Sequence, residues 1–197
     1  MPIRKGTDIA YISHPMAVAS RVDVWGGDEN QFSAALLHDV VENGGICYRD
    51  VIESRFGQAV VDIVMDCSDA APQAGEKKGD WLTRKTAYLQ HLETVSEAEL
   101  LASAADNWHN LPSILSDVRR IGDAVFERSI RPVLNLEKKK TLTLWYYQSL
   151  ISVYRRRGLK FIDELQRLLD EIKQETSISN GEHFCCALGQ LHETSSP

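Results

Sequence analysis

The sequence predicts an all-α fold, a helical bundle of about eight to ten helices. Apolar residues recur at intervals of three and four, as in Val18, Val22 and Trp25, which places them on one face of a helix. No run of strand length alternates between apolar and polar residues beside hairpin turn residues. Helix start and stop signals recur along the chain at the intervals that a bundle needs.

In the first part of the chain, four helices are expected. Asp28 and Gln31 have the spacing of a capping box at the start of the second helix. Gly57 falls where the third helix should end. The expected spans are 14–25, 29–42, 49–56 and 58–67.

In the second part, six more helices are expected. Ser96 and Glu99 have capping-box spacing, and Gly122 and Gly158 lie at expected helix ends. One face of the last helix is apolar, because it contains Phe161, Leu165, Leu168, Leu169 and Ile172. The expected spans are 81–94, 97–110, 112–121, 123–130, 135–155 and 159–175.

These spans predict one domain over 1–175, followed by a poorly ordered tail over 176–197, where the helical periodicity ends. The segment 68–79 is rich in small residues and contains Pro72, Gly75 and Gly79, so we expect a loop. Its length is enough to suggest a function.

Composition excludes several classes of protein. The chain of 197 residues has 22 Lys and Arg against 28 Asp and Glu, a net charge of −6, with 43% hydrophobic residues. This acidic balance argues against nucleic acid bound through its phosphates. No apolar stretch approaches the ~18 residues of a membrane span, and no secretory signal is visible, so we expect a cytoplasmic protein. The oligomeric state stays open, and a homo-oligomer is one alternative.

The segment AALLHDVVE, residues 34–42, contains the most informative cluster. On a continuous helix, His38, Asp39 and Glu42 fall at about 0°, 100° and 40°, within one arc. Two carboxylates and an imidazole among Leu and Val are costly unless a cation or a polar network receives them. This combination of ligand types suits a divalent transition metal.

Two further ligands are expected from other parts of the chain. His14 lies in YISHP, where Pro15 can open a helix, and Asp106 is a carboxylate within the helix LLASAADNWHNL. Together with His38 and Asp39, they make a plausible metal site of two imidazoles and two carboxylates.

Four blocks of sequence then resemble one family. They are RKGTDIAYISHPMAVA (4–19), AALLHDVVEN (34–43), FGQAVVDIV (56–64) and ASAADNWHNL (102–111). The pattern H…HD…D is that of the HD-domain metal-dependent phosphohydrolases. The blocks resemble the hydrolase domain of the Rel/Spo alarmone enzymes, and the stand-alone small alarmone hydrolases most closely, from Arg4 to about Arg156.

The resemblance implies an all-α HD fold that uses one Mn²⁺ per chain to remove the 3′-pyrophosphate of ppGpp or pppGpp. Some small relatives act on the adenosine analogues ppApp and pppApp instead, and the choice of purine base stays open. The expected partner is therefore a small purine nucleotide. About forty residues follow Arg156, too few for a synthetase domain, so we expect hydrolysis only.

The resemblance also assigns roles to single residues. It makes His14, His38, Asp39 and Asp106 the metal ligands, and Glu42 the residue that positions or deprotonates the attacking water. Nucleotide contacts are expected from Arg4, Lys5, Asn110 and, with loose alignment, Tyr146 or Tyr147. Because an acidic protein needs local cations to hold a highly charged substrate, Arg84 and Lys85 are further candidates.

This chain departs from the family at one catalytic position and at its beginning. The family has Glu-Asp where this chain has Glu42 and Asn43, and Asn43 can orient a water but cannot accept its proton. The family also has a helix before the Arg-Lys pair. These departures favour one alternative, a nucleotide-binding sensor without turnover. Another HD-family nucleotide phosphohydrolase, such as a nucleotidase, is the second alternative.

Overall fold

The computed structural model describes residues 3–4, 8–68, 79–128, 130 and 134–176. Within these ranges every regular element is a helix, and the only strand-like feature is an isolated bridge between Ile3 and Ala10, so the all-α prediction is confirmed. Most of the expected loop over 68–79 and of the tail over 176–197 lies outside the described residues. The elements are α1 (Ser13–Val24), α2 (Glu29–Leu37), α3 (Val40–Gly44), α4 (Tyr48–Phe56), α5 (Gln58–Cys67), α6 (Trp81–His91), α7 (Glu97–Ile121), the 3₁₀ helix η1 (Gly122–Arg128), α8 (Leu136–Arg156) and α9 (Ile162–Glu175).

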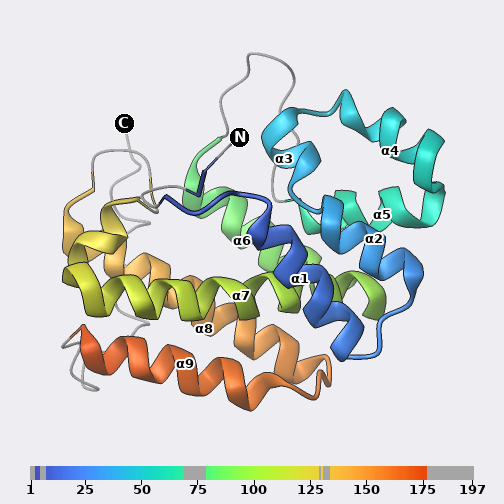
Figure 1. The fold of residues 1–197 in the computed structure, drawn as a ribbon. Coiled ribbons are helices and arrows are strands. Elements are labelled where there is room, and N and C mark those ends of the chain that lie inside the picture. Colours follow the sequence, from blue (N-terminus) through green and yellow to red (C-terminus); the bar gives the residue numbers. More distant parts are fainter. Residues whose placement is uncertain (1–2, 5–7, 69–78, 129, 131–133, 177–197) are drawn as a thin grey trace, which may run out of the picture.

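The long helix α7 runs through the middle of the bundle (Figure 1). The helices α1, α2 and α5 pack on it from one side, and α8, α9 and η1 pack on it from the other. Both predicted capping boxes are present, at the starts of α2 and α7. Of the helices in the described part of the chain, none has the length and apolar composition required to cross a bilayer.

The hydrophobic core consists of three clusters that meet on α7. The largest lies among α6, α7, η1, α8 and α9, and it contains the fully buried Leu100 and Leu169. Three small residues within one turn of α7, Ala102, Ala104 and Ala105, belong to three different clusters. Because alanine lets backbones approach closely, this part of α7 is packed on several sides, and Asp106 follows directly.

The expected helix over 29–42 is wrong in one respect, since it is two helices with a break at His38 and Asp39. Nδ1 of His38 lies 2.7 Å from the carbonyl oxygen of Ala35, the acceptor that the amide of Asp39 would use in a continuous α-helix. A side chain that takes this acceptor competes with the helical hydrogen bond. The break therefore occurs at the two residues that the site needs.

The expected boundary between 97–110 and 112–121 is also wrong, because α7 continues through Pro112. Proline in a helix interior removes one backbone hydrogen bond and costs about 3 kcal/mol. The hydroxyl of Ser113 donates to the carbonyl oxygen of His109 at 3.0 Å, which satisfies one acceptor near the proline. Burial of Leu111 and Leu115 on the same helix offsets the remaining cost.

Candidate metal centre

Three segments bring the four predicted ligands together. His14 lies in the first turn of α1, His38 and Asp39 lie at the break between α2 and α3, and Asp106 lies in the middle of α7. Nε2 of His14 is 3.1 Å from Oδ1 of Asp106, 3.6 Å from Oδ2 of Asp39 and 3.2 Å from Nε2 of His38. Nε2 of His38 is 3.5 Å from Oδ2 of Asp39 and 3.7 Å from Oδ1 of Asp106. His14, His38 and Asp106 therefore form one compact group, and Asp39 lies beside its two histidines.

The chemistry of this cluster fits a cation. Because a carbonyl oxygen only accepts, Nδ1 of His38 donates to Ala35, and in the neutral ring Nε2 has the lone pair that faces His14. His14, His38 and Asp106 each offer a ligand atom within 4.8 Å of the others. Acceptors that face one another repel unless a proton or a metal ion lies between them. This donor set suits a divalent metal ion.

The carboxylate of Asp106 is ready to bind a cation at neutral pH. Burial raises its pKa, but the hydrogen bond from His14 and the charges of His38 and His14 outweigh burial and lower the pKa to about 2. For His38 the balance is the opposite: burial lowers the pKa, whereas Asp39 and Asp106 raise it, and the pKa lies above its ordinary value. A proton on His38 therefore balances the carboxylates in the metal-free cluster.

Tyr11 is a site residue that spacing arguments missed. Its hydroxyl donates to the carboxylate of Asp39, and Nδ2 of Asn43 donates to the same hydroxyl at 3.4 Å. Burial and the hydrogen bond to Asp39 raise the pKa of Tyr11, so the hydroxyl keeps its proton. The only sequence signal was its position within the first of the four blocks, three residues before His14.

His109 is the second missed residue. It is more simply interpreted from the sequence as a structural or surface histidine, yet its Nδ1 lies 2.8 Å from Nδ1 of His14. Burial and the positive charges of His14 and Arg4 lower the pKa of His109 to about 4, so it is neutral at pH 7. Its position in the fourth block, between Asp106 and Asn110, was the available signal.

Glu42 and Asn43 lie beside the cluster, at the beginning of α3. Glu42 is in the first turn of this helix and is half-buried. Its charge helps to raise the pKa of both His38 and Tyr11, which places it within electrostatic reach of the candidate ligands. Asn43 is exposed, and its amide points to Tyr11.

Two of the expected nucleotide contacts lie next to the ligands. Nη2 of Arg4 donates to Oδ1 of Asn110 at 3.2 Å, and Nδ2 of Asn110 donates to Oδ1 of Asp106 at 2.8 Å. Arg4 is half-buried, so its guanidinium is held against α7. Lys5 lies outside the described residues.

The other expected nucleotide contacts are Arg84 and Lys85 on α6 and Tyr146 on α8. Lys85 helps to lower the pKa of Asp106, and its Nζ lies 4.6 Å from the centre of the Tyr146 ring. Tyr146 is 8% exposed, so most of its surface belongs to the core. Nε of Arg84 donates to the carbonyl oxygen of Gly79 at 3.2 Å, at the beginning of α6.

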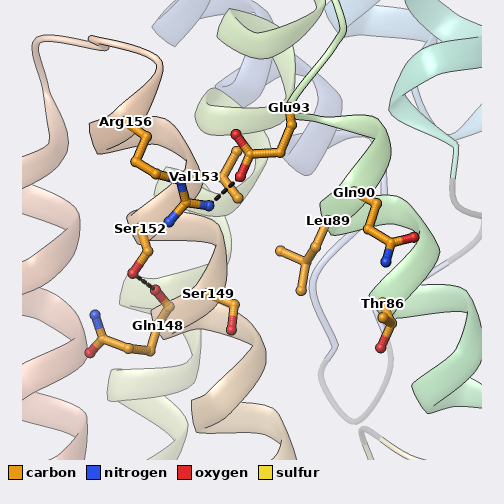
Figure 2. Close-up of a pocket in the computed structure, with 9 residues that line it drawn as sticks. All are labelled: Thr86, Leu89, Gln90, Glu93, Gln148, Ser149, Ser152, Val153 and Arg156. Atoms are coloured by element: carbon orange, nitrogen blue, oxygen red, sulfur yellow. Dashed lines mark hydrogen bonds and ion pairs between the residues drawn. The ribbon is translucent and has the colours of Figure 1, made fainter.

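A groove of about 320 Å³ lies away from these ligands, between α6 and α8 (Figure 2). Its lining combines polar side chains, such as Gln90 and Ser152, with the apolar side chains of Leu89 and Val153. An ion pair joins Glu93, in the turn after α6, to Arg156 at the end of α8. None of the four candidate metal ligands lines this groove.

Comparison with known proteins decides the family. The model of the HD domain matches residues 2–117, which is more than half of the chain. The chain belongs to the HD-domain family. The candidate metal ligands all lie within the matched residues, and they include the His38-Asp39 pair.

Curated relatives of this HD domain confirm the resemblance to Rel/Spo hydrolases. A probable guanosine-3′,5′-bis(diphosphate) 3′-pyrophosphohydrolase of Synechocystis sp. is 41% identical over 61 residues, 31% of this chain and 8% of the relative. The bifunctional (p)ppGpp synthase/hydrolase SpoT of Escherichia coli K12 is 31% identical over 115 residues, 56% of this chain and 16% of that protein. The chain thus spans a small part of the length of these relatives.

Two solved structures share the fold. The crystal structure of lmo0812 from Listeria monocytogenes EGD-e has a TM-score of 0.65 and 26% identity, over 84% of this chain and 99% of that one. A metazoan ortholog of SpoT, described as hydrolysing ppGpp, has a TM-score of 0.60 and 22% identity, over 86% of this chain and 83% of that one. The second likeness shows the fold alone.

Proposed function

We propose that this HD domain is a Mn²⁺-dependent hydrolase that removes the 3′-pyrophosphate from (p)ppGpp or (p)ppApp. The observation that carries the proposal is the compact group of His14, His38 and Asp106, with Asp39 beside its two histidines and with Glu42 and Arg4 nearby. The relatives named as guanosine-3′,5′-bis(diphosphate) 3′-pyrophosphohydrolases support the substrate class. The products are pyrophosphate and a nucleoside di- or triphosphate.

In this proposal, His14, His38, Asp39 and Asp106 hold the metal ion. When bound, the ion would lower the pKa of a bound water and neutralise part of the phosphate charge. Glu42 accepts the proton of the attacking water, because it is the acidic side chain of the family motif and lies within electrostatic reach of the ligands. Asn43 cannot accept the proton of the water. Its amide donates to the hydroxyl of Tyr11, and this hydroxyl donates to the carboxylate of Asp39.

The substrate phosphates need positive charge near the metal. Arg4 is held next to Asp106 through Asn110, and the charge of Lys85 reaches Asp106 from α6. These two cations are our candidates for the phosphate contacts, with Lys5 and Arg84 as further ones. Local cations of this kind hold an anionic ligand on a protein whose net charge is −6.

Of the two adjacent tyrosines on α8, Tyr147 is the better candidate for a contact with the nucleotide. Burial and the charge of Asp106 raise the pKa of Tyr147, and the charges of Lys85 and Arg4 partly oppose this rise. The Tyr147 hydroxyl therefore lies within electrostatic reach of both cations. Tyr146 instead packs against Trp81, with ring centres 5.8 Å apart. We therefore assign Tyr146 to the support of Lys85 and Tyr147 to the pocket.

A substrate panel tests this function. Purified protein with Mn²⁺ is incubated with ppGpp, pppGpp, ppApp, pppApp and ordinary nucleoside monophosphates, and the products are separated by chromatography. We expect pyrophosphate from one or more alarmones. Phosphate release from the monophosphates would identify a nucleotidase instead, and binding without turnover would identify a sensor.

Glu42→Gln is the variant that tests the proposed proton acceptor. The amide keeps the shape of the side chain but cannot take a proton, so we expect a loss on the order of 10²–10⁴-fold in kcat. Glu53→Gln on α4 is the matched control, because this glutamate pairs with Arg49 at 2.8 Å and lies outside the cluster. An unchanged kcat in Glu42→Gln would contradict the assignment.

A further inference from the structure

His109 contacts a candidate ligand without being one. Its Nδ1 lies 2.8 Å from Nδ1 of His14 and 3.3 Å from Nη1 of Arg4. The rings of His109 and His14 are 4.9 Å apart and tilted by 42°. Nδ1 of His109 therefore contacts both Arg4 and Nδ1 of His14. The other ring nitrogen of His14, Nε2, faces the metal centre.

Arg4 decides the direction of both hydrogen bonds. A guanidinium has donors and no acceptor, so Nδ1 of His109 must accept from it and has no proton. The contact between the two Nδ1 atoms then requires the proton to be on His14. In the metal-free cluster, Nε2 of His14 also donates to Asp106 at 3.1 Å, and a metal ion displaces this second proton. The neutral ring that remains has its proton on Nδ1 and its lone pair on Nε2. This is the tautomer that a metal ion needs.

Arg4 is itself fixed by other contacts on α7. Nη1 also donates to Oγ of Ser113 at 3.2 Å, and Nη2 donates to Oδ1 of Asn110 at 3.2 Å. The hydroxyl of Ser113 donates back to the carbonyl oxygen of His109. The guanidinium is thus held where it can direct hydrogen bonds to the histidine.

We propose that His109 is a positioning residue: as the acceptor between Arg4 and His14, it holds His14 in the tautomer that binds a divalent ion and makes metal affinity depend on Arg4. This inference rests on one part of the proposed function, the binding of a metal ion by His14, and does not depend on the substrate. It gives Arg4 a second role besides its expected nucleotide contact. Partners that orient ligating histidines are typically worth 10–100-fold in metal affinity.

Two substitutions at His109 distinguish the effect of its hydrogen-bond acceptor from the effect of its side-chain volume. In His109→Asn, the amide Oδ1 takes the place of Nδ1 as an acceptor, so we expect Mn²⁺ affinity close to that of the wild type. His109→Leu fills a similar volume without an acceptor, and we expect Mn²⁺ to bind on the order of 10–100-fold more weakly. Isothermal titration calorimetry with Mn²⁺ measures both. Equal affinities in the leucine variant and the wild type, or equal losses in both variants, would overturn the proposal.

Arg4→Met tests the coupling. We expect this substitution to weaken Mn²⁺ binding when His109 is present and to have no further effect in the His109→Leu background. Such non-additivity is what a double-mutant cycle measures for groups that act through one another. Additive losses would overturn the role of His109 as the link.

Controls separate this inference from a general loss of structure and from the proposed function. His91→Leu removes a histidine that pairs with Asp66 at 2.9 Å outside the cluster, and we expect wild-type Mn²⁺ affinity. Circular dichroism reports folding, and His109→Ala replaces the leucine variant if that one does not fold. Wild-type protein that binds Mn²⁺ without cleaving alarmones would refute the proposed function and leave this test valid. Wild-type protein that binds no divalent ion would overturn both.

Discussion

At the scale of single residues, the site depends on where protons lie. Asp106 stays ionised because its pKa is lowered to about 2. Burial lowers the pKa of His38, but the charges of Asp39 and Asp106 outweigh burial and raise it above its ordinary value. Ala35 and His109 then determine which ring nitrogen of His38 and His14 faces the centre. A metal ion that binds at this site must therefore displace the proton of His38.

The raised pKa of His38 predicts a pH dependence of metal binding. Because binding needs the neutral imidazole, Mn²⁺ displaces the proton, and affinity should fall by up to about tenfold for each pH unit below the raised pKa. Calorimetry in two buffers of different protonation enthalpy measures the proton released. Affinity that is equal at pH 6 and pH 8, with no proton release, would contradict this prediction.

Asp39→Ala should abolish metal binding and leave the helices folded. Asp39 is a candidate ligand at the break between α2 and α3, and its side chain makes no capping hydrogen bond to α3. Metal content after dialysis and far-ultraviolet circular dichroism measure the two effects. Asp50→Ala on α4 is the control, because its side chain is 88% exposed and lies outside the cluster. Normal metal content in Asp39→Ala would remove Asp39 from the ligand set.

At the scale of elements, a buried polar network joins α6, α7 and α8 beneath the site. The hydroxyl of Ser103 lies 2.9 Å from that of Tyr88 and 2.8 Å from that of Tyr154. Nδ2 of Asn107 donates to the Tyr154 hydroxyl at 3.0 Å. Asn107 directly follows Asp106 in the chain. The network thus holds the helix of one ligand against the two helices that contain Lys85 and Tyr147.

Tyr154→Phe should lower the free energy of unfolding by about 1–3 kcal/mol, because Ser103 and Asn107 each lose a buried partner. Urea unfolding measures this change as a lower midpoint with an unchanged m-value. Tyr48→Phe is the control, since Tyr48 is 44% exposed. A change within 0.5 kcal/mol of the wild type, the range of ordinary surface substitutions, would show that the network adds little stability.

At the scale of the whole molecule, the site joins parts of the chain that are distant in sequence. Its ligands come from α1, from the break after α2, and from α7, and these three segments meet around one point. A bound ion would therefore link the N-terminal helices to the central helix.

Mn²⁺ should consequently raise the melting temperature. At a free concentration of 100 times Kd, a ligand that binds only the folded state adds about 2.7 kcal/mol. For a chain of this size, this corresponds to a shift of about 5–11 °C. Differential scanning calorimetry with and without Mn²⁺ measures it. Asp106→Asn should lose most of the shift, and a shift equal to that of the wild type would contradict the ligand assignment.

The sequence by itself determined the helical class, the family and the candidate ligands. Helical periodicity and capping residues are local properties, and both predicted capping boxes are present. The four blocks indicated the HD family, and the match over residues 2–117 confirms that family. The ligand assignment stays a prediction. The metal, the catalytic role of Glu42 and the boundary of the domain at residue 175 stay predictions.

Only the tertiary structure decided how the helices break and which neighbours orient the ligands. The break at His38 depends on a side-chain hydrogen bond to Ala35, and the continuity through Pro112 depends on packing around α7. Tyr11 and His109 became site residues because folding brings α1, α3 and α7 together. Contacts between residues 28 or 95 positions apart leave no periodic pattern in the chain, so no spacing rule could have found them.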